Sequence, residues 1–133
     1  MSTGLLIITH DQIGDALLAT AVAMIGSSPM TTRTMAVSLD TDLEQLTGEA
    51  RSLARELDQG DGVLILTDMF GSTPSNVAAL LLDQPGIAVV SGINLPMLIR
   101  VLNYAHLGLP ELAHKATSGG QDGIVWSSST ARR

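Results

Sequence analysis

Residues 62–82 read GVLILTDMFGSTPSNVAALLL, and this stretch decides the fold. Its apolar part, 62–67, is typical of a strand buried on both faces, and a short polar turn separates it from an apolar pattern with a helical period. Pro74 suits the first turn of that helix, where its missing N–H costs no hydrogen bond, and Ser72 or Thr73 can cap the helix. The stretch is therefore predicted to run from strand through tight turn to helix.

The turn in this stretch is predicted to bind an anion. The first amides of a helix have no partner within the helix, and the helix dipole favours negative charge beside them. Gly71 can adopt a positive φ or let a ligand approach the backbone closely. Asp68, which follows the apolar run, would share the same space. We therefore expect the functional site of the protein to lie around this turn.

The rest of the chain repeats the alternation of strand and helix. Three further apolar runs predict strands, and four further patterns with a helical period predict helices. The expected strands are 4–9, 32–37 and 87–91, and the expected helices are 15–25, 42–57, 97–105 and 109–117.

The order of these elements predicts a three-layer α/β/α sandwich. Strands that alternate with helices form a mainly parallel, doubly wound sheet with helices on both faces. Strand 32–37 is expected near an edge of the sheet, and strand 87–91 is expected to be buried. Gly119 and Gly120 are expected to end the last helix, before a short final strand at 123–126.

Composition narrows the possible functions. The chain has 133 residues, which predicts one domain at 1–126 and a disordered tail at 127–133. Hydrophobic residues make up 45% and aromatic residues only 2%, so the core must be aliphatic. The net charge of −6 argues against nucleic acid as a partner, and the lack of cysteine excludes thiolate chemistry and disulfides. The chain has no apolar run long enough to span a membrane, so we expect a cytoplasmic protein without direct membrane insertion.

Two strand ends carry side chains that suit one chemical task. His10 ends the first predicted strand and Asp68 ends the central one, although either residue alone could be an ordinary turn residue. In this fold class ligands bind beyond the carboxyl ends of the strands, and the turn at 92–94 belongs to the same edge. A carboxylate that accepts the Nδ1 proton of an imidazole fixes its tautomer and leaves Nε2 as a nucleophile.

The loop after Asp68 predicts a place for a phosphoryl group. The amides from Gly71 to Ser75 could bind its oxygens, and the hydroxyls of Ser72, Thr73 and Ser75 could add donors. The sequence has no metal-ligand cluster, no Walker-type motif and no dinucleotide motif, so we expect no metal and no cofactor. A histidine nucleophile, an orienting carboxylate and an anion site together predict a phosphohistidine carrier.

Three motifs resemble the IIA component of the mannose-family phosphoenolpyruvate:sugar phosphotransferase system. The similarity extends over 4–126, and the motifs are GLLIITH at 4–10, DMFGSTPSN at 68–76 and SGINLPML at 91–98. The resemblance implies a phosphotransferase whose His10 accepts a phosphoryl group from the phosphocarrier HPr, with Asp68 as its hydrogen-bonding partner. It implies that the group passes to a IIB component or to a regulatory target.

The resemblance also implies a homodimer in which the strand at 123–126 is swapped between subunits and pairs in antiparallel fashion. In two respects the chain departs from the family. Ser72 follows Gly71 where a second glycine is common, and a serine fits there if its φ stays negative. The chain ends without the linker and IIB domain of many members, which predicts a free-standing IIA protein.

Two other functions remain open from the sequence. One is the phosphoryl-donor subunit of a dihydroxyacetone kinase, which has a similar fold and a histidine at the position of His10. The other is a non-catalytic regulatory binding protein that is controlled by phosphorylation of His10.

Overall fold

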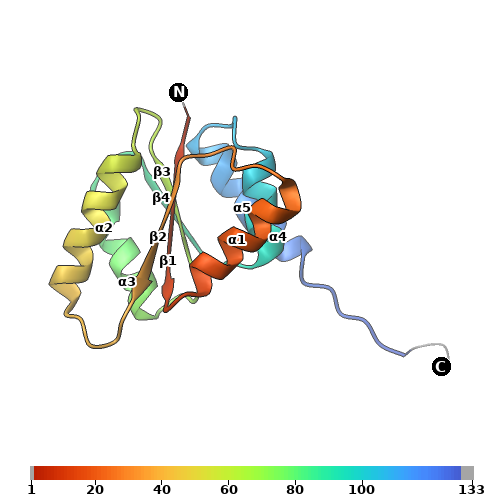
Figure 1. The fold of residues 1–133 in the computed structure, drawn as a ribbon, viewed down its shortest axis with the longest axis horizontal. Helices are drawn as coiled ribbons and strands as arrows, with labels where there is room; N and C mark the ends of the chain where they lie inside the picture. The colour runs from red at the N-terminus through yellow and green to blue at the C-terminus, as the bar shows by residue number, and fades with distance from the viewer. Residues whose placement is uncertain (1, 130–133) are drawn as a thin grey trace.

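A parallel sheet lies between two layers of helices in the computed structural model, which describes residues 2–129 (Figure 1). The strand order within these residues is β2-β1-β3-β4. The strands are β1 (Gly4–His10), β2 (Thr32–Val37), β3 (Val63–Thr67) and β4 (Ile87–Ser91). The helices are α1 (Ile13–Ile25), α2 (Leu43–Leu57), α3 (Thr73–Leu80), α4 (Leu95–Asn103), α5 (Leu109–Asp122) and the 3₁₀ turn η1 (Leu81–Asp83). The predicted α/β/α sandwich is confirmed.

The side chains of β1 show why the central strands read as uninterrupted apolar runs. Leu6 and Ile8 pack in a core with α2 and α3, whereas Leu5 and Ile7 pack in a second core with α1, α4 and α5. All four are fully buried. Figure 1 shows the same two layers, with α2 and α3 on one side of the sheet and the other three helices opposite. Both cores are aliphatic, as the composition predicts, and they hold the central strands rigidly.

The strand order changes direction between β1 and β3. β1 pairs in parallel with β2 on one side and with β3 on the other, and Ile8 lies opposite Thr67. The residues that follow this register, His10 and Asp68, therefore leave the sheet side by side. This is the edge at which ligands bind in doubly wound sheets.

The two outer strands differ from each other in how well the sequence predicts them. β2 lies at one edge of the sheet, as expected. The expectation that β4 is buried is wrong, because β4 forms the opposite edge and all five of its residues are only half-buried. Within residues 2–129 no strand pairs with its outer side.

Helix α5 is longer than the sequence predicts. It continues through Gly119 and Gly120 to Asp122. A Cβ atom on Gly119 would lie 2.6 Å from the Cβ of Arg100, and one on Gly120 would lie 2.8 Å from the Cε of Met97. The two glycines therefore let α5 approach α4 closely, and they do not stop the helix.

The final strand expected at 123–126 does not form within the single chain. Gly123 caps α5, and residues 124–129 have no regular secondary structure and lead away from the body of the molecule (Figure 1). Ile124, Val125 and Trp126 are consequently 76%, 76% and 88% exposed. The tail predicted at 127–133 lies partly outside the described residues. Within 2–129, no helix is both long and apolar enough to cross a membrane.

Candidate functional site

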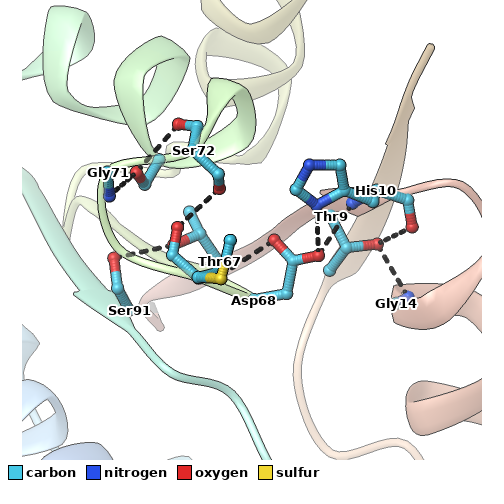
Figure 2. Close-up of polar contacts among 10 residues, drawn as sticks. Thr9, His10, Gly14, Thr67, Asp68, Gly71, Ser72 and Ser91 are labelled. Atoms are coloured by element: carbon cyan, nitrogen blue, oxygen red, sulfur yellow. Dashed lines mark hydrogen bonds and ion pairs between the residues drawn. The ribbon is translucent and has the colours of Figure 1, made fainter. Parts of the chain in front are cut away.

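His10 and Asp68 form the centre of the site (Figure 2). Asp68 Oδ2 lies 2.7 Å from the ring Nδ1 of His10 and also accepts a hydrogen bond from the backbone N–H of His10, at 3.0 Å. Its other oxygen, Oδ1, accepts the backbone N–H of Met69 at 3.0 Å. Both carboxylate oxygens are therefore occupied by donors, which fixes the carboxylate relative to the imidazole.

The surroundings of Asp68 keep its carboxyl group ionised. Burial of the side chain favours the neutral form, but the hydrogen bonds from the backbone and ring of His10 outweigh it, so the pKa of Asp68 is lowered from its ordinary value of 3.8. A carboxylate at this position accepts the Nδ1 proton of the imidazole and leaves Nε2 without a proton. The side chain of His10 is 32% exposed and that of Asp68 is 11% exposed, so the imidazole is the member of the pair that a second molecule can reach.

The loop between β3 and α3 adopts the turn that the sequence predicts. Gly71 has a φ of +87°, which only glycine adopts freely. Ser72 has a φ of −93° and a ψ of 173°, so the negative φ that a serine needs after Gly71 is present. Pro74 lies in the first turn of α3. Ser72 is the cap residue, although its side chain makes no capping bond to the helix.

The hydroxyl groups of this loop are used differently from one another. The Ser75 hydroxyl accepts the Gly71 N–H at 2.8 Å and donates to the Ser72 carbonyl at 3.0 Å. The Ser72 hydroxyl donates to the Met69 carbonyl at 2.6 Å. Both serines therefore stabilise the loop itself. Thr73 is half-buried at the first position of α3.

The turn at 92–94, which follows the third predicted strand end, holds the backbone directly before Asp68. The N–H groups of Gly92 and Ile93 both donate to the Thr67 carbonyl at 3.0 Å, directly before Asp68. Asn94 caps α4 by accepting the Met97 N–H at 2.9 Å. This turn therefore holds the end of β3 through its backbone.

Sequence reasoning missed the residues on either side of His10. The Thr9 hydroxyl is buried; it accepts the Gly14 N–H at 2.9 Å and donates to the His10 carbonyl at 3.1 Å, so it ties the start of α1 to the end of β1. Asp11 has a φ of +45°, which is uncommon for a residue other than glycine and turns the chain sharply after His10. A polar residue that ends a continuous apolar run was the available signal for Thr9.

One ion pair outside the site joins two helices. Arg100 lies 3.2 Å from Asp122, and so joins α4 to α5 away from the site. Within residues 2–129, no group of three or more His, Cys, Asp or Glu side chains is placed to hold a metal ion.

The sequence of this chain is similar to those of known phosphotransferase-system proteins. The chain is 28% identical over 127 residues to the mannose-specific EIIAB component of the phosphotransferase system from Escherichia coli K12. This alignment covers 93% of the chain but only 39% of that protein, so the chain spans about two-fifths of the length of this relative.

Solved structures give the same fold. The mannose/sorbose-specific IIA subunit from Enterococcus faecalis superimposes with a TM-score of 0.85 over 100% of both chains, at 24% identity. The phosphotransferase component EIIA from Streptococcus agalactiae superimposes with a TM-score of 0.78 over 92% of this chain and 95% of that chain, at 25% identity. The family model EIIA-man, described as the PTS system fructose IIA component, matches residues 4–117. This chain therefore belongs to the EIIA-man family of phosphotransferase-system IIA components.

Proposed function

We propose that this protein is a phosphohistidine carrier of the sugar phosphotransferase system. His10 would accept a phosphoryl group from HPr and pass it to a IIB component or to a regulatory target. The observation that carries the proposal is the 2.7 Å contact between His10 Nδ1 and Asp68 Oδ2, beside an imidazole that is partly exposed. Family membership supports the same role.

The proposed step exchanges one nitrogen–phosphorus bond for another. The lone pair on His10 Nε2 attacks the phosphorus of the donor's phosphohistidine, and the electron pair of the broken bond returns to the donor ring. The Nδ1 proton of His10 stays directed at Asp68, whose negative charge balances the positive charge that develops on the ring. Since the two bonds are alike, the site needs accurate positioning more than a large reduction of the barrier.

The β3–α3 loop is the proposed place for the phosphoryl oxygens. The first-turn amides of α3 and the helix dipole would contribute about 0.5–2 kcal/mol to holding an anion. The hydroxyls of Ser72 and Ser75 and the amide of Gly71 already have partners in the loop. Among the four loop residues that the sequence suggests, we therefore expect Thr73 to contact the phosphoryl group directly and the other three to shape the loop.

The surface around His10 suits a protein partner with an apolar centre and a basic rim. The segments 10–15, 38–44 and 68–73 follow three of the strands, and they contain no lysine or arginine. Their exposed large apolar residues are Ile13, Leu39, Leu43, Met69 and Phe70. Their exposed acidic residues are Asp11, Asp15, Asp40, Asp42 and Glu44. An acidic surface of this kind favours encounter with a basic partner. We propose that HPr is this partner and that the two proteins meet in the cytoplasm.

The proposed homodimer uses the C-terminal segment. Residues 124–126 are apolar and exposed, and the outer edge of β4 lies beside a hollow of about 450 Å³ lined in part by Ala79, Leu82 and Val89. An unpaired strand edge readily accepts a further strand. Segment 124–126 of a second copy would cover this edge and remove its own apolar side chains from water.

Phosphorylation of the purified protein tests the carrier function. The protein is incubated with phosphoenolpyruvate, Enzyme I and HPr, and its intact mass is measured before and after mild acid. We expect the mass of one phosphoryl group, acid-labile and absent from His10→Ala. Phosphorylation of His10→Ala at the wild-type rate would refute the assignment of His10. A pull-down that recovers dihydroxyacetone kinase subunits rather than HPr would favour the donor-subunit function instead.

A further inference from the structure

A chain of hydrogen bonds runs from the β3–α3 loop to His10 (Figure 2). The Ser75 hydroxyl donates to the Ser72 carbonyl, and the Ser72 hydroxyl donates to the Met69 carbonyl. The N–H of Met69 donates to Asp68 Oδ1, and Asp68 Oδ2 holds the ring of His10. Each bond restrains the group that makes the next one, so the orientation of the carboxylate depends on the loop as well as on the His10 backbone N–H that Oδ2 accepts.

We propose that Ser72 is a positioning residue for the His10–Asp68 pair. By holding the Met69 carbonyl, Ser72 restrains the backbone after Met69, and through this residue it limits the direction of the N–H that orients Asp68. The oriented carboxylate in turn keeps the proton of His10 on Nδ1. This inference rests on the proposed carrier function and deepens it, because it names a residue that prepares the nucleophile without touching the phosphoryl group.

The contacts of Met69 show what the hydroxyl at position 72 contributes in this chain. The side chain of Met69 is 61% exposed, so packing does little to fix this residue. Its carbonyl receives two donors from Ser72, the hydroxyl at 2.6 Å and the backbone N–H at 3.3 Å. A glycine at position 72 would leave only the longer of the two bonds.

Ser75 supports Ser72 from the other side of the turn. Its hydroxyl is buried and bridges the Gly71 N–H and the Ser72 carbonyl, which encloses the left-handed Gly71. Among the described residues the Ser75 hydroxyl bonds to Gly71 and Ser72 and not to Met69, so its influence on His10 passes through Ser72. We therefore expect Ser72→Ala to disturb His10 more than Ser75→Ala does.

Loss of the Ser72 hydroxyl should change the tautomer of His10. Once the Met69 backbone can rotate, Asp68 Oδ1 loses its fixed donor and the carboxylate can turn out of the plane of the imidazole. The Nδ1 proton is then held less strongly, and the share of imidazole protonated on Nε2 rises. That tautomer cannot attack phosphorus, because its Nε2 lone pair is occupied.

The test compares full-length variants by ¹⁵N NMR of the unphosphorylated His10 side chain and by the rate of phosphoryl acceptance from HPr. In Ser72→Ala we expect at least about a twofold larger share of the Nε2-protonated tautomer and an acceptance rate about three- to tenfold lower. Ser72→Thr keeps a hydroxyl and should restore both values. Ser52→Ala, at an exposed serine of α2, is the matched control and should change neither.

Two results would overturn the proposal. One is an unchanged tautomer distribution in Ser72→Ala, with or without a lower melting temperature, because a purely structural serine would leave His10 unaffected. The other is a Ser72→Thr protein that behaves like Ser72→Ala. Since the NMR measurement needs no phosphoryl donor, it decides on Ser72 even if the wild-type protein accepts no phosphoryl group and the carrier function fails.

Discussion

Replacement of Asp68 by asparagine tests the central pair most directly. Asp68 accepts three N–H donors, two from His10 and one from Met69, and it uses both of its oxygens. Asparagine has one oxygen and one NH₂ group, so in either orientation its NH₂ faces an N–H. The less costly orientation keeps the oxygen toward His10 and leaves the Met69 N–H without an acceptor.

The expected magnitude follows from these contacts. A hydrogen bond to a charged acceptor is worth about 1.5–3 kcal/mol and one to a neutral acceptor about 0.5–1.5 kcal/mol, so the substitution removes roughly 1–1.5 kcal/mol at His10. Leaving the Met69 N–H without an acceptor costs about 1 kcal/mol more. If the loss is felt fully in the transition state, phosphoryl transfer slows by roughly 10- to 100-fold. The fold should persist, because the buried aliphatic cores do not involve Asp68.

The assay is single-turnover transfer from phosphorylated HPr, followed by intact mass, with circular dichroism as the check on folding. Asp61→Asn is the control, because it removes the same charge from an exposed turn remote from His10 in the sheet. Transfer by Asp68→Asn within twofold of the wild-type rate would show that the carboxylate does not activate His10.

Four further predictions follow from the same structure. The lowered pKa of Asp68 means that its ionised form stabilises the folded state above the ordinary carboxyl value of 3.8, and that this contribution is lost as the pH falls through the lower, folded-state pKa. The stability advantage of wild type over Asp68→Asn in urea unfolding should therefore shrink as the pH falls below about 4. A constant difference down to about pH 2 would contradict the pKa direction. Gly119→Ala should destabilise the protein by about 1–3 kcal/mol, because its Cβ would meet the Cβ of Arg100 at 2.6 Å. The control is Gly48→Ala, which has open space in α2 and should stabilise the protein by about 0.5–1 kcal/mol. Equal effects of the two substitutions in urea unfolding would refute the packing role of Gly119. Phe70→Ala, at a side chain that is 87% exposed, should slow acceptance of the phosphoryl group from HPr about fivefold or more at low protein concentration. It should leave the His10 NMR signals unchanged. An unchanged rate would remove Phe70 from the proposed docking surface. Val125→Asp should convert the proposed dimer to a monomer in sedimentation, because Val125 is 76% exposed in the single chain and would be covered in the dimer. Ser128→Asp is the control and should leave the dimer intact. A Val125→Asp protein that stays dimeric would rule out the swapped segment.

Local pattern predicted much of this molecule. The apolar runs that become β1 and β3, and the proline and glycine of the loop before α3, each depend on residues close in sequence. The pairing of His10 with Asp68 was predictable as well, because parallel strands of this fold class end at one edge and only two strand ends carried suitable side chains.

The predictions from sequence were wrong where the role of a residue depends on a neighbour that is distant in the sequence. Gly119 and Gly120 carry the local signature of a helix end, but they lie in the middle of a contact between α4 and α5, which no local pattern reveals. The run at 87–91 is as apolar as a central strand, yet it lies at the sheet edge, because strand order depends on how the crossovers pack.

By itself, then, the sequence determined most of the elements, the sandwich and the two residues of the hydrogen-bonded pair, since these follow from hydrophobic period and turn chemistry. Only the tertiary structure decided how that pair is held. The register that sets Ile8 opposite Thr67 brings the His10 backbone N–H, as well as its ring, to a single oxygen of Asp68. The conformation of the loop turns the Ser72 and Ser75 hydroxyls, which the sequence offered as ligands for phosphate, toward the backbone of the loop itself. A hydroxyl bonds to whichever acceptor the fold brings within about 3 Å, and that choice is made by the three-dimensional structure.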